Sequence, residues 1–225
     1  SNLLAIASKS KTKTLKFKNQ FQINEEFVFN KYEDLLNCKD IDIIYISLPN
    51  SYHYEWILRS IKKNKKVLVE KPATLNFEEA QKLSEIIKKK NIFFNEGFMY
   101  RHDTQIKKVI ELIKNNEIGK PLSMESSFGV NILTKKKFYF FQKEKKIDKN
   151  SRQFNNQLGG GCILDLGCYP TSLSLLICSL IKNINYNKFE ITNLVREIGS
   201  TGVDINAEAN IIFDNGFNAK VKASF

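Results

Sequence analysis

The sequence holds few of the side chains that build metal centres and disulfide frameworks. It has four cysteines and two histidines, and no two cysteines stand in a Cys-x-x-Cys spacing. A zinc site needs ligands at characteristic spacings, which this set does not offer. We therefore expect no metal site, and free thiols buried in a reducing compartment, which we take to be the cytoplasm.

Glycine, proline and long apolar runs are also scarce. The 10 Gly and 4 Pro exclude collagen-like and low-complexity classes. No stretch approaches the roughly 18 uninterrupted apolar residues of a membrane span, so no membrane association is expected. With 42 % hydrophobic and 26 % charged residues, the composition is typical of a globular protein, and 225 residues suffice for one large domain or two small ones.

Acidic residues are outnumbered, 24 against 35 basic ones, and the formal net charge is +11. Such a balance is compatible with nucleic-acid binding. However, only four of the basic residues are arginine, the side chain that nucleic-acid sites favour for base and phosphate contacts. The lysines are scattered along the whole chain. We therefore favour a solvated lysine-rich surface and expect no nucleic-acid partner.

The first hundred residues alternate short apolar strands with helical patterns. Asn76 is the expected N-cap of one helix, because Glu78 and Glu79 follow it in the first turn. This alternation predicts an α/β domain over residues 1–100, with a Rossmann-type parallel sheet covered on both faces. The expected strands lie at 3–7, 27–29, 41–48, 66–70 and 92–94, and the expected helices at 53–63 and 76–90.

The remaining residues, 101–225, predict an α+β domain on an open, mostly antiparallel sheet. Residues 135–156 are expected to form a loop with an aromatic cluster at 138–141, and Asn215-Gly216 is a hairpin-turn signal. Because the chain starts and stops inside expected strands, we expect both domains to be incomplete, the first lacking its initial strand–turn–helix. The expected helices lie at 105–115 and 163–181, and the expected strands at 122–130, 189–196, 204–213 and 217–225.

Five segments occur in an order and spacing that resemble one enzyme family. They read DIIYISLPNSYHYEW, VLVEKPATLNFEEAQKL, EGFMYRHD, EIGKPLSMESSF and GGGCILDLGCYP. Together they resemble the Gfo/Idh/MocA oxidoreductases, and the Asp-x-x-x-Tyr pattern is most similar to the glucose–fructose oxidoreductase and dihydrodiol–xylose dehydrogenase type. The resemblance implies hydride transfer between a nicotinamide and a hydroxyl or carbonyl of a sugar, polyol or related cyclic alcohol.

The expected catalytic residues are Lys71, Asp165 and Tyr169. Lys71 follows a strand end, the edge at which open α/β sheets bind ligands, and the resemblance implies that it is an acid/base or assists one. Asp165 and Tyr169 share a helix face, where Tyr169 would exchange the proton and Asp165 would hold a substrate hydroxyl. As alternatives, Asp165 is a helix N-terminal acid and Lys71 a surface lysine. The glycines at 159–161 are expected to let the backbone approach a ligand.

No Gly-x-Gly-x-x-Gly turn is present, yet the end of the first expected strand carries Ser8 and Lys9, and no acid follows until Glu25. This favours NADP over NAD, with both residues on the 2′-phosphate, unless the segment is only a solvated loop. The resemblance implies further cofactor contacts, although His53 also fits a solvent-facing helix turn and Arg101 an interdomain pair. These further contacts are Leu48, Pro49, Asn50, His53, Glu70, Lys71, Pro72 and Arg101.

The sequence therefore predicts an NADP-dependent dehydrogenase or reductase. The resemblance also implies a homodimer or homotetramer formed through the open sheet, with which Phe213, Phe217 and Phe225 are compatible. We place substrate specificity in residues 133–156. The alternative function is a catalytically idle relative that binds a nucleotide as a sensor or interaction module.

Overall fold

The computed structural model describes residues 2–137, 141–144, 147–182, 185, 187–214 and 216–225. The chain forms two compact units. The first comprises Ser1–Leu48 and Tyr52–Gly97, and the second Pro49–Ser51 and Phe98–Phe225.

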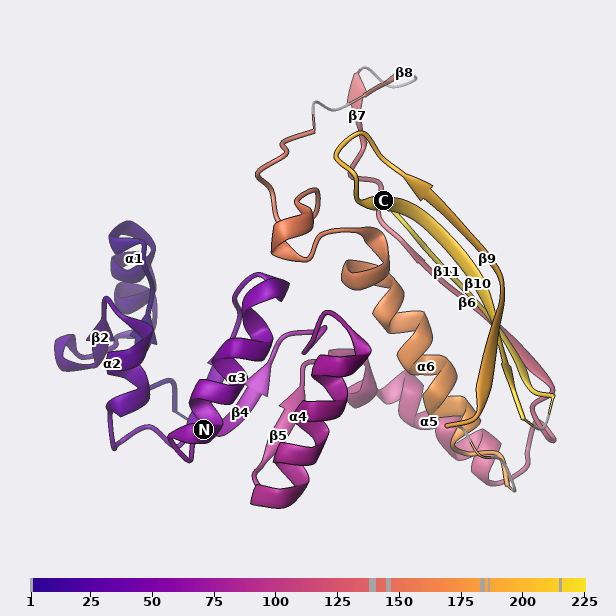
Figure 1. Ribbon diagram of the computed structural model, residues 1–225, viewed down its shortest axis with the longest axis horizontal. Helices are drawn as coiled ribbons and strands as arrows, with labels where there is room; N and C mark the ends of the chain where they lie inside the picture. The colour runs from indigo at the N-terminus through magenta and orange to yellow at the C-terminus, as the bar shows by residue number, and fades with distance from the viewer. Residues whose placement is uncertain (1, 138–140, 145–146, 183–184, 186, 215) are drawn as a thin grey trace. The chain divides into compact units, whose positions relative to one another are not determined.

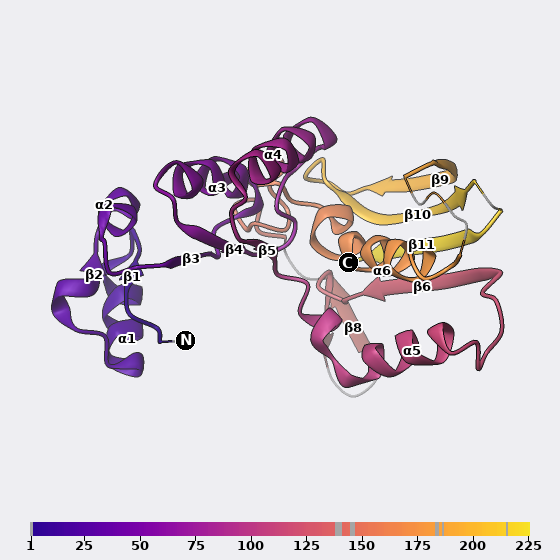
Figure 2. The ribbon, with the colours of Figure 1, turned by 90° about the horizontal axis from the view of Figure 1, so that it is seen from below.

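Parallel strands form the first unit, in two separate ladders. β3, β4 and β5 make one sheet in that order, with Ile46 opposite Val69 and Val69 opposite Glu96. β1 pairs with β2 in the other. Figure 2 shows α3 and α4 on the same side of β3–β5. The elements are β1 Ile6–Ala7, α1 Lys11–Phe21, β2 Val28–Phe29, α2 Tyr32–Asn37, β3 Ile43–Ile46, α3 His53–Lys62, β4 Lys66–Val69, α4 Phe77–Lys90 and β5 Phe94–Glu96.

The core of this unit lies between that sheet and its helices. Ile44, Ile57 and Val67 are among its buried side chains. The opposite face of β3 is open, because Ile43 is 46 % and Tyr45 56 % exposed. The expected Rossmann-type parallel fold is confirmed, but the expectation of one sheet covered on both faces is wrong for the residues that the structure describes.

Helix α4 begins where the sequence predicts. The Asn76 side chain accepts a hydrogen bond from the Glu79 N–H at 2.9 Å, which satisfies one of the free donors of the first turn. Helices α1 and α2 were not expected. In α1 the only buried residue is Thr14, so the helix has no apolar stripe facing a core, and such a stripe is the signal that predicts a helix from sequence.

A mixed sheet forms the second unit, with α6 on one face (Figure 1). Its strand order is β6-β11-β10-β9, with β11 parallel to β6 and the other pairs antiparallel. The predicted mostly antiparallel sheet is therefore confirmed, whereas the parallel pair was not predicted. The elements are a 3-10 helix Met99–His102, α5 Thr104–Lys114, β6 Ser123–Gly129, β7 Thr134–Lys137, β8 Phe141–Glu144, a 3-10 helix Asn156–Leu158, a π-helix Ile163–Gly167, α6 Cys168–Cys178, β9 Phe189–Ile198, β10 Asp204–Phe213 and β11 Asn218–Ser224.

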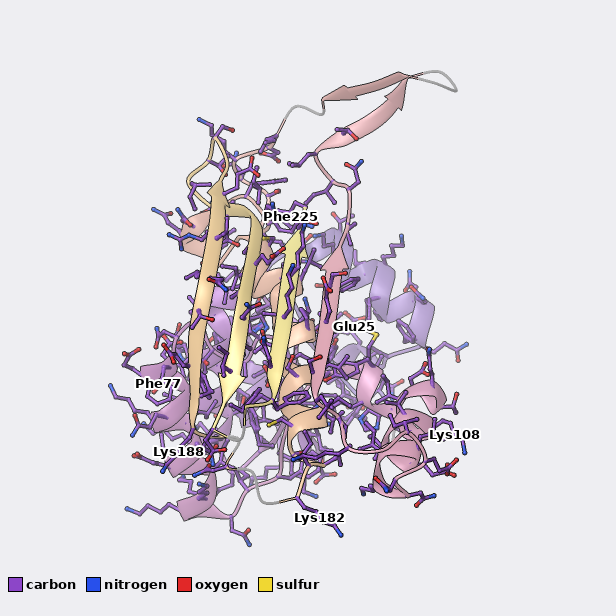
Figure 3. The ribbon with its side chains drawn as sticks, turned by 90° about the vertical axis from the view of Figure 1, so that its right-hand side faces the viewer. Glu25, Phe77, Lys108, Lys182, Lys188 and Phe225 are labelled. Atoms are coloured by element: carbon purple, nitrogen blue, oxygen red, sulfur yellow. The ribbon has the colours of Figure 1, made fainter. Side chains whose placement is uncertain are left out.

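Phe213 and Phe217 lie in the core of this unit. Each is 2 % exposed and packs with Ile177 of α6, and Phe225 contacts Phe154. They are therefore not on the open face of the sheet, and their expected part in an oligomer contact is wrong. Figure 3 looks onto the four strands with α6 behind them.

Three further expectations need correction or fall outside the described residues. The segment expected as a loop at 135–156 contains the antiparallel pair β7–β8. Residues 138–140 of the expected aromatic cluster, and Asn215 of the expected hairpin turn, lie outside the described part of the chain. The helix expected at 163–181 starts as a π-helix, and α6 ends at Cys178.

One helical stretch, Asn156–Cys178, is long and apolar enough to cross a membrane by length and composition alone. Half of it is buried, and Ile177 and Cys178 at its end belong to the core of the second unit. The apolar side chains of this stretch therefore pack into the core of the second unit.

Candidate functional site

The turn that carries Lys71 lies at the carboxyl edge of the parallel sheet, directly after β4. His53, the first residue of α3, is 0 % exposed. Its Nδ1 lies 2.7 Å from the Pro72 carbonyl oxygen, and its Nε2 lies 2.7 Å from the Leu48 carbonyl oxygen. Both ring nitrogens therefore face the backbone at the ends of two neighbouring strands.

The other side of the same turn contacts β5. The Glu96 carboxylate accepts a hydrogen bond from the Ala73 N–H at 2.8 Å. Gly97 follows, and a Cβ at its position would lie 3.1 Å from the Val69 carbonyl oxygen, a tight contact that a larger residue could make only with a small shift of the neighbouring backbone. Backbone and side chains thus pack around the Lys71 turn on both sides.

Glu70, the residue before Lys71, is held by the neighbouring strand. The Tyr45 hydroxyl donates a hydrogen bond to its carboxylate at 2.5 Å. Burial, with a further contribution from Glu70, raises the pKa of Tyr45 to about 12. The phenol therefore remains a donor across the neutral range and fixes the orientation of Glu70.

Ser8 and Lys9 lie at the end of β1, ahead of α1. The Ser8 hydroxyl oxygen accepts the Ser10 N–H at 3.1 Å, Lys9 is exposed, and the first turn of α1 has no acidic residue. A helix start without acids, flanked by a hydroxyl and an ammonium, suits an anionic group.

Asn50 belongs with the second unit, together with Pro49. Its side-chain amide is buried and donates a hydrogen bond to the Gly159 carbonyl at 2.9 Å. Asn50 is therefore held against the glycine segment that precedes the π-helix.

The glycines at 159–161 are packed against the chain itself. A Cβ on Gly160 would lie 2.7 Å from the Gln153 carbonyl oxygen, and one on Gly161 would lie 2.5 Å from the Asp204 carboxylate. Gly161 also has φ +110. For Gly160 and Gly161, the expectation that the missing side chain makes room for a ligand is wrong, because the protein's own atoms take that space.

Asp165 lies in the π-helix and is buried. Its carboxylate accepts a hydrogen bond from the Arg152 guanidinium at 3.1 Å, while half of the Arg152 side chain remains exposed. The start of this helix is capped by Asp204, which accepts the Ile163 N–H at 2.7 Å. π-helical turns occur frequently at functional sites, and here one places an ion-paired carboxylate one turn ahead of Tyr169.

Tyr169 stands among aromatic rings in α6. The ring centroids of Phe98, Phe128 and Tyr100 lie 5.8, 5.2 and 6.1 Å from its own. The contacts with Phe98 and Phe128 are edge-to-face and the one with Tyr100 is tilted. Edge-to-face contacts at these distances fix the plane of a phenol. The side chain of Tyr169 is thus held by neighbours from two other segments of the second unit, the start of the 3-10 helix Met99–His102 and β6.

Arg101 contacts this aromatic group as well. Its guanidinium lies 5.8 Å from the Phe98 ring centroid and donates to the Ser172 hydroxyl at 2.9 Å. The Tyr100 hydroxyl shares the same serine oxygen, also at 2.9 Å. These contacts join the 3-10 helix Met99–His102 to α6.

The structure therefore divides the expected site residues between the units. The carboxyl edge of β3 and β4 gathers Leu48, His53, Glu70, Lys71 and Pro72, and the second unit holds Pro49, Asn50, Arg101, Asp165 and Tyr169. Sequence reasoning missed Tyr45 and Arg152, which contact Glu70 and Asp165. It also missed Glu96 and Asp204, which bind the backbone close to Lys71 and Asp165. The scarcity of arginine was the one signal that could have found Arg152, but it marks all four arginines of the sequence equally.

Comparison with known proteins defines the class to which this arrangement belongs. The profile described as oxidoreductase family, NAD-binding Rossmann fold, matches residues 1–98. The profile of the C-terminal domain of the Gfo/Idh/MocA proteins matches residues 106–225. The chain belongs to the Gfo/Idh/MocA oxidoreductase family.

Among curated relatives, a dTDP-3,4-didehydro-2,6-dideoxy-alpha-D-glucose 3-reductase of Saccharopolyspora spinosa is 31 % identical over 75 % of this chain and 46 % of its own length. A D-xylose 1-dehydrogenase (NADP(+)) of Haloferax volcanii is 26 % identical over 88 % of this chain and 54 % of its own. The chain thus spans about half the length of the curated relatives that it matches.

Among solved structures, a 3-ketoreductase from Actinomadura kijaniata in complex with NADP and TDP-benzene has a TM-score of 0.80 and 25 % identity, covering 98 % of this chain and 61 % of that one. An aldose-aldose oxidoreductase from Caulobacter crescentus also has a TM-score of 0.80, at 21 % identity, covering 100 % of this chain and 63 % of that one. The second likeness concerns the fold alone.

Proposed function

We propose that this chain provides the catalytic residues of an NADP-dependent oxidoreductase that acts on a hydroxyl or carbonyl group of a sugar, polyol or related cyclic alcohol. The observation that carries the proposal is that the surrounding residues fix the turn of Lys71 and the side chains of Asp165 and Tyr169. Lys71 lies in a turn contacted from both sides, and Tyr169 stands in an aromatic cage one turn after the ion-paired Asp165. Such support is what a preorganised site requires.

NADP fits the residues at the end of β1. Ser8 and Lys9 would hold the 2′-phosphate, since no carboxylate competes for the ribose at this strand end. Two relatives support this choice, the xylose dehydrogenase by its name and the ketoreductase by its bound NADP. When bound, the cofactor supplies the hydride acceptor or donor. The chain has no glycine-rich pyrophosphate turn of its own.

The proton is then handled by the chain's own residues. In the oxidative direction, the Tyr169 phenolate takes the substrate's hydroxyl proton as the hydride leaves the carbon that bears this hydroxyl. In the reductive direction, the Tyr169 phenol returns the proton to the carbonyl oxygen. The family resemblance gives Lys71 the part of favouring the phenolate, since a lysine ammonium does so for a phenol beside it. Asp165 accepts a hydrogen bond from a second substrate hydroxyl, with its carboxylate oriented by Arg152.

The first test is a fluorescence titration with NADPH and NADH, read through Trp56, the single tryptophan. We expect tighter binding of NADPH, and a loss of that preference in Lys9→Ala. Equal binding of both nucleotides would refute the assignment of Lys9.

Turnover is tested with Lys71→Ala and Tyr169→Phe, and the exposed Lys66→Ala serves as the matched control. Each site variant should lose about 10²-fold or more in kcat, the range of a general acid–base group, while Lys66→Ala keeps wild-type activity. If Lys71→Ala retained activity within a few fold, its assigned role would be wrong. Binding of NADPH without turnover of any sugar by the wild type would identify the idle relative instead.

We also propose that the open face of the β6-β11-β10-β9 sheet forms the contact of a homodimer or homotetramer. This face carries an ion-pair network in which Lys220 contacts Glu208 at 2.9 Å and Glu125 at 3.9 Å. A hydrogen bond from Lys220 holds the pKa of Glu208 below its ordinary value. A light-scattering mass equal to one chain at micromolar concentration would contradict this assembly.

A further inference from the structure

His53 is the most deeply buried polar ring of the first unit, and its two nitrogens have different partners. One lies 2.7 Å from the Pro72 carbonyl oxygen and the other 2.7 Å from the Leu48 carbonyl oxygen. Leu48 follows β3 and Pro72 follows β4, which are neighbours in the parallel sheet. The imidazole therefore links the chain ends of two strands at the edge where such sheets bind ligands.

Glu96 makes the corresponding contact from the other neighbour of β4. It is the last residue of β5, and its carboxylate accepts the Ala73 N–H at 2.8 Å. Pro72 and Ala73 directly follow Lys71, so both contacts hold the backbone within two residues of the lysine. The side chain before it, that of Glu70, is held by Tyr45.

Burying polar groups costs free energy unless they are paired. A turn that served only to connect β4 to α4 would not need a buried imidazole and a carboxylate directed at its backbone. Fixing a reacting group is different, because a displacement of about 1 Å can cost about 10²-fold in rate.

We propose that His53 and Glu96 are positioning residues, which hold the Lys71 turn from both sides and thereby set the place of the lysine ammonium. The inference rests on the proposed function of Lys71. An imidazole suits the task because its two nitrogens point in divergent directions, so that it can donate to one carbonyl with one N–H and to both carbonyls when both nitrogens carry a proton. A glutamine amide, in contrast, carries both of its N–H groups on one nitrogen.

The first experiment needs no turnover. The folded chain is acylated briefly with N-acetoxysuccinimide, and mass spectrometry gives the rate at Lys71 relative to the exposed Lys66 of the same molecule. In His53→Leu and in Glu96→Ala we expect this ratio to change by about fivefold or more, since the turn loses an anchor. Glu96→Gln keeps an acceptor for the Ala73 N–H and should stay within about twofold of wild type.

His102→Gln is the matched control, because His102 is the other histidine and is exposed. If His53→Leu does not fold, His53→Gln, which keeps one donor group, replaces it. An unchanged Lys71 ratio in both a folded His53 variant and Glu96→Ala overturns the proposal, even where thermal stability falls, because the contacts would then be merely structural.

Turnover provides the second readout. With NADPH and an accepted carbonyl substrate, the same variants should lose about tenfold or more in kcat while KM changes less than about threefold. A kcat that does not fall contradicts a positioning role, and so does a KM that rises by the same factor as kcat falls. If the wild type turns over no substrate, the proposed function fails, but the labelling ratio still decides whether His53 and Glu96 set the place of Lys71.

Discussion

Cys162 offers a quantitative test of how the π-helix Ile163–Gly167 is anchored in the second unit. The residue is 0 % exposed, and its thiol donates a hydrogen bond to the Ala223 carbonyl of β11, with Sγ and oxygen 3.5 Å apart. Burial, and after it a hydrogen bond and the charge of Asp204, raise the pKa of the thiol from 9.0 to about 12. The folded chain therefore keeps a proton that the unfolded chain releases.

The sign and size of the effect follow from this difference. Stability from the protonated thiol is fully present below pH 9.0, falls as the unfolded state ionises, and is lost as the pH rises through about 12. A difference of one pKa unit corresponds to ~1.36 kcal/mol, so the total loss in the free energy of unfolding is about 4 kcal/mol. At pH 10.5, about 2 kcal/mol of this free energy has been lost.

The assay is urea unfolding of wild type and Cys162→Ala at pH 8 and at pH 10.5. Between the two values, the free energy of unfolding should fall by about 2 kcal/mol more in wild type than in the variant. Cys38→Ala, which removes a half-exposed thiol, is the control and should behave as wild type. Parallel pH dependences of wild type and Cys162→Ala would refute the reasoning, whatever the variant costs at pH 8.

Three further changes test the packing directly. Gly160→Ala places a Cβ 2.7 Å from a backbone oxygen, so the free energy of unfolding should fall by more than about 2 kcal/mol in a urea titration. Asn76→Ala removes the N-cap of α4 and should cost about 1 kcal/mol in thermal unfolding, while Asn76→Asp should restore it. Lys65→Met removes the ammonium that donates to two backbone carbonyls at 2.6 and 2.7 Å. Calorimetry should show a free energy of unfolding that is lower by about 2 kcal/mol or more in this variant and unchanged in Lys63→Met.

The parts of the fold that could be predicted are those with strong local patterns. The alternation of β10 gave its bounds, Asp204–Phe213, and the Asn76 cap gave the start of α4. Helix α1 lacked an apolar stripe and was missed. The π-helix Ile163–Gly167 was missed because its altered winding depends on the glycine packing before it and on the cap from Asp204, which is distant in sequence.

The site could be predicted only as far as its motifs reach. Lys71 and Tyr169 lie in segments that resemble a known family, so their positions were accessible. Glu96 and Arg152 could not be predicted, because their contacts with Ala73 and Asp165 form only when the chain folds. Nothing in the local sequence marks a carboxylate that will accept a backbone N–H. The run of glycines at 159–161 led to a false expectation, because three successive glycines suggested room for a ligand. At Gly160 and Gly161 the chain itself fills the space that a Cβ would take.

The position of β11 in the sheet has a consequence for the order of folding. This strand is the last of the second unit in sequence, yet it lies between β6 and β10, pairing with both. During synthesis, β6 therefore has no partner within the sheet until β11 has left the ribosome, and the pairing closes a long loop, which is slow. The described strands of the first unit pair with strands that are near in sequence, so this unit can fold earlier. Newly made chains should therefore pass through a state in which the first unit is folded and β6 is still unpaired. We expect a chaperone to matter most at this stage.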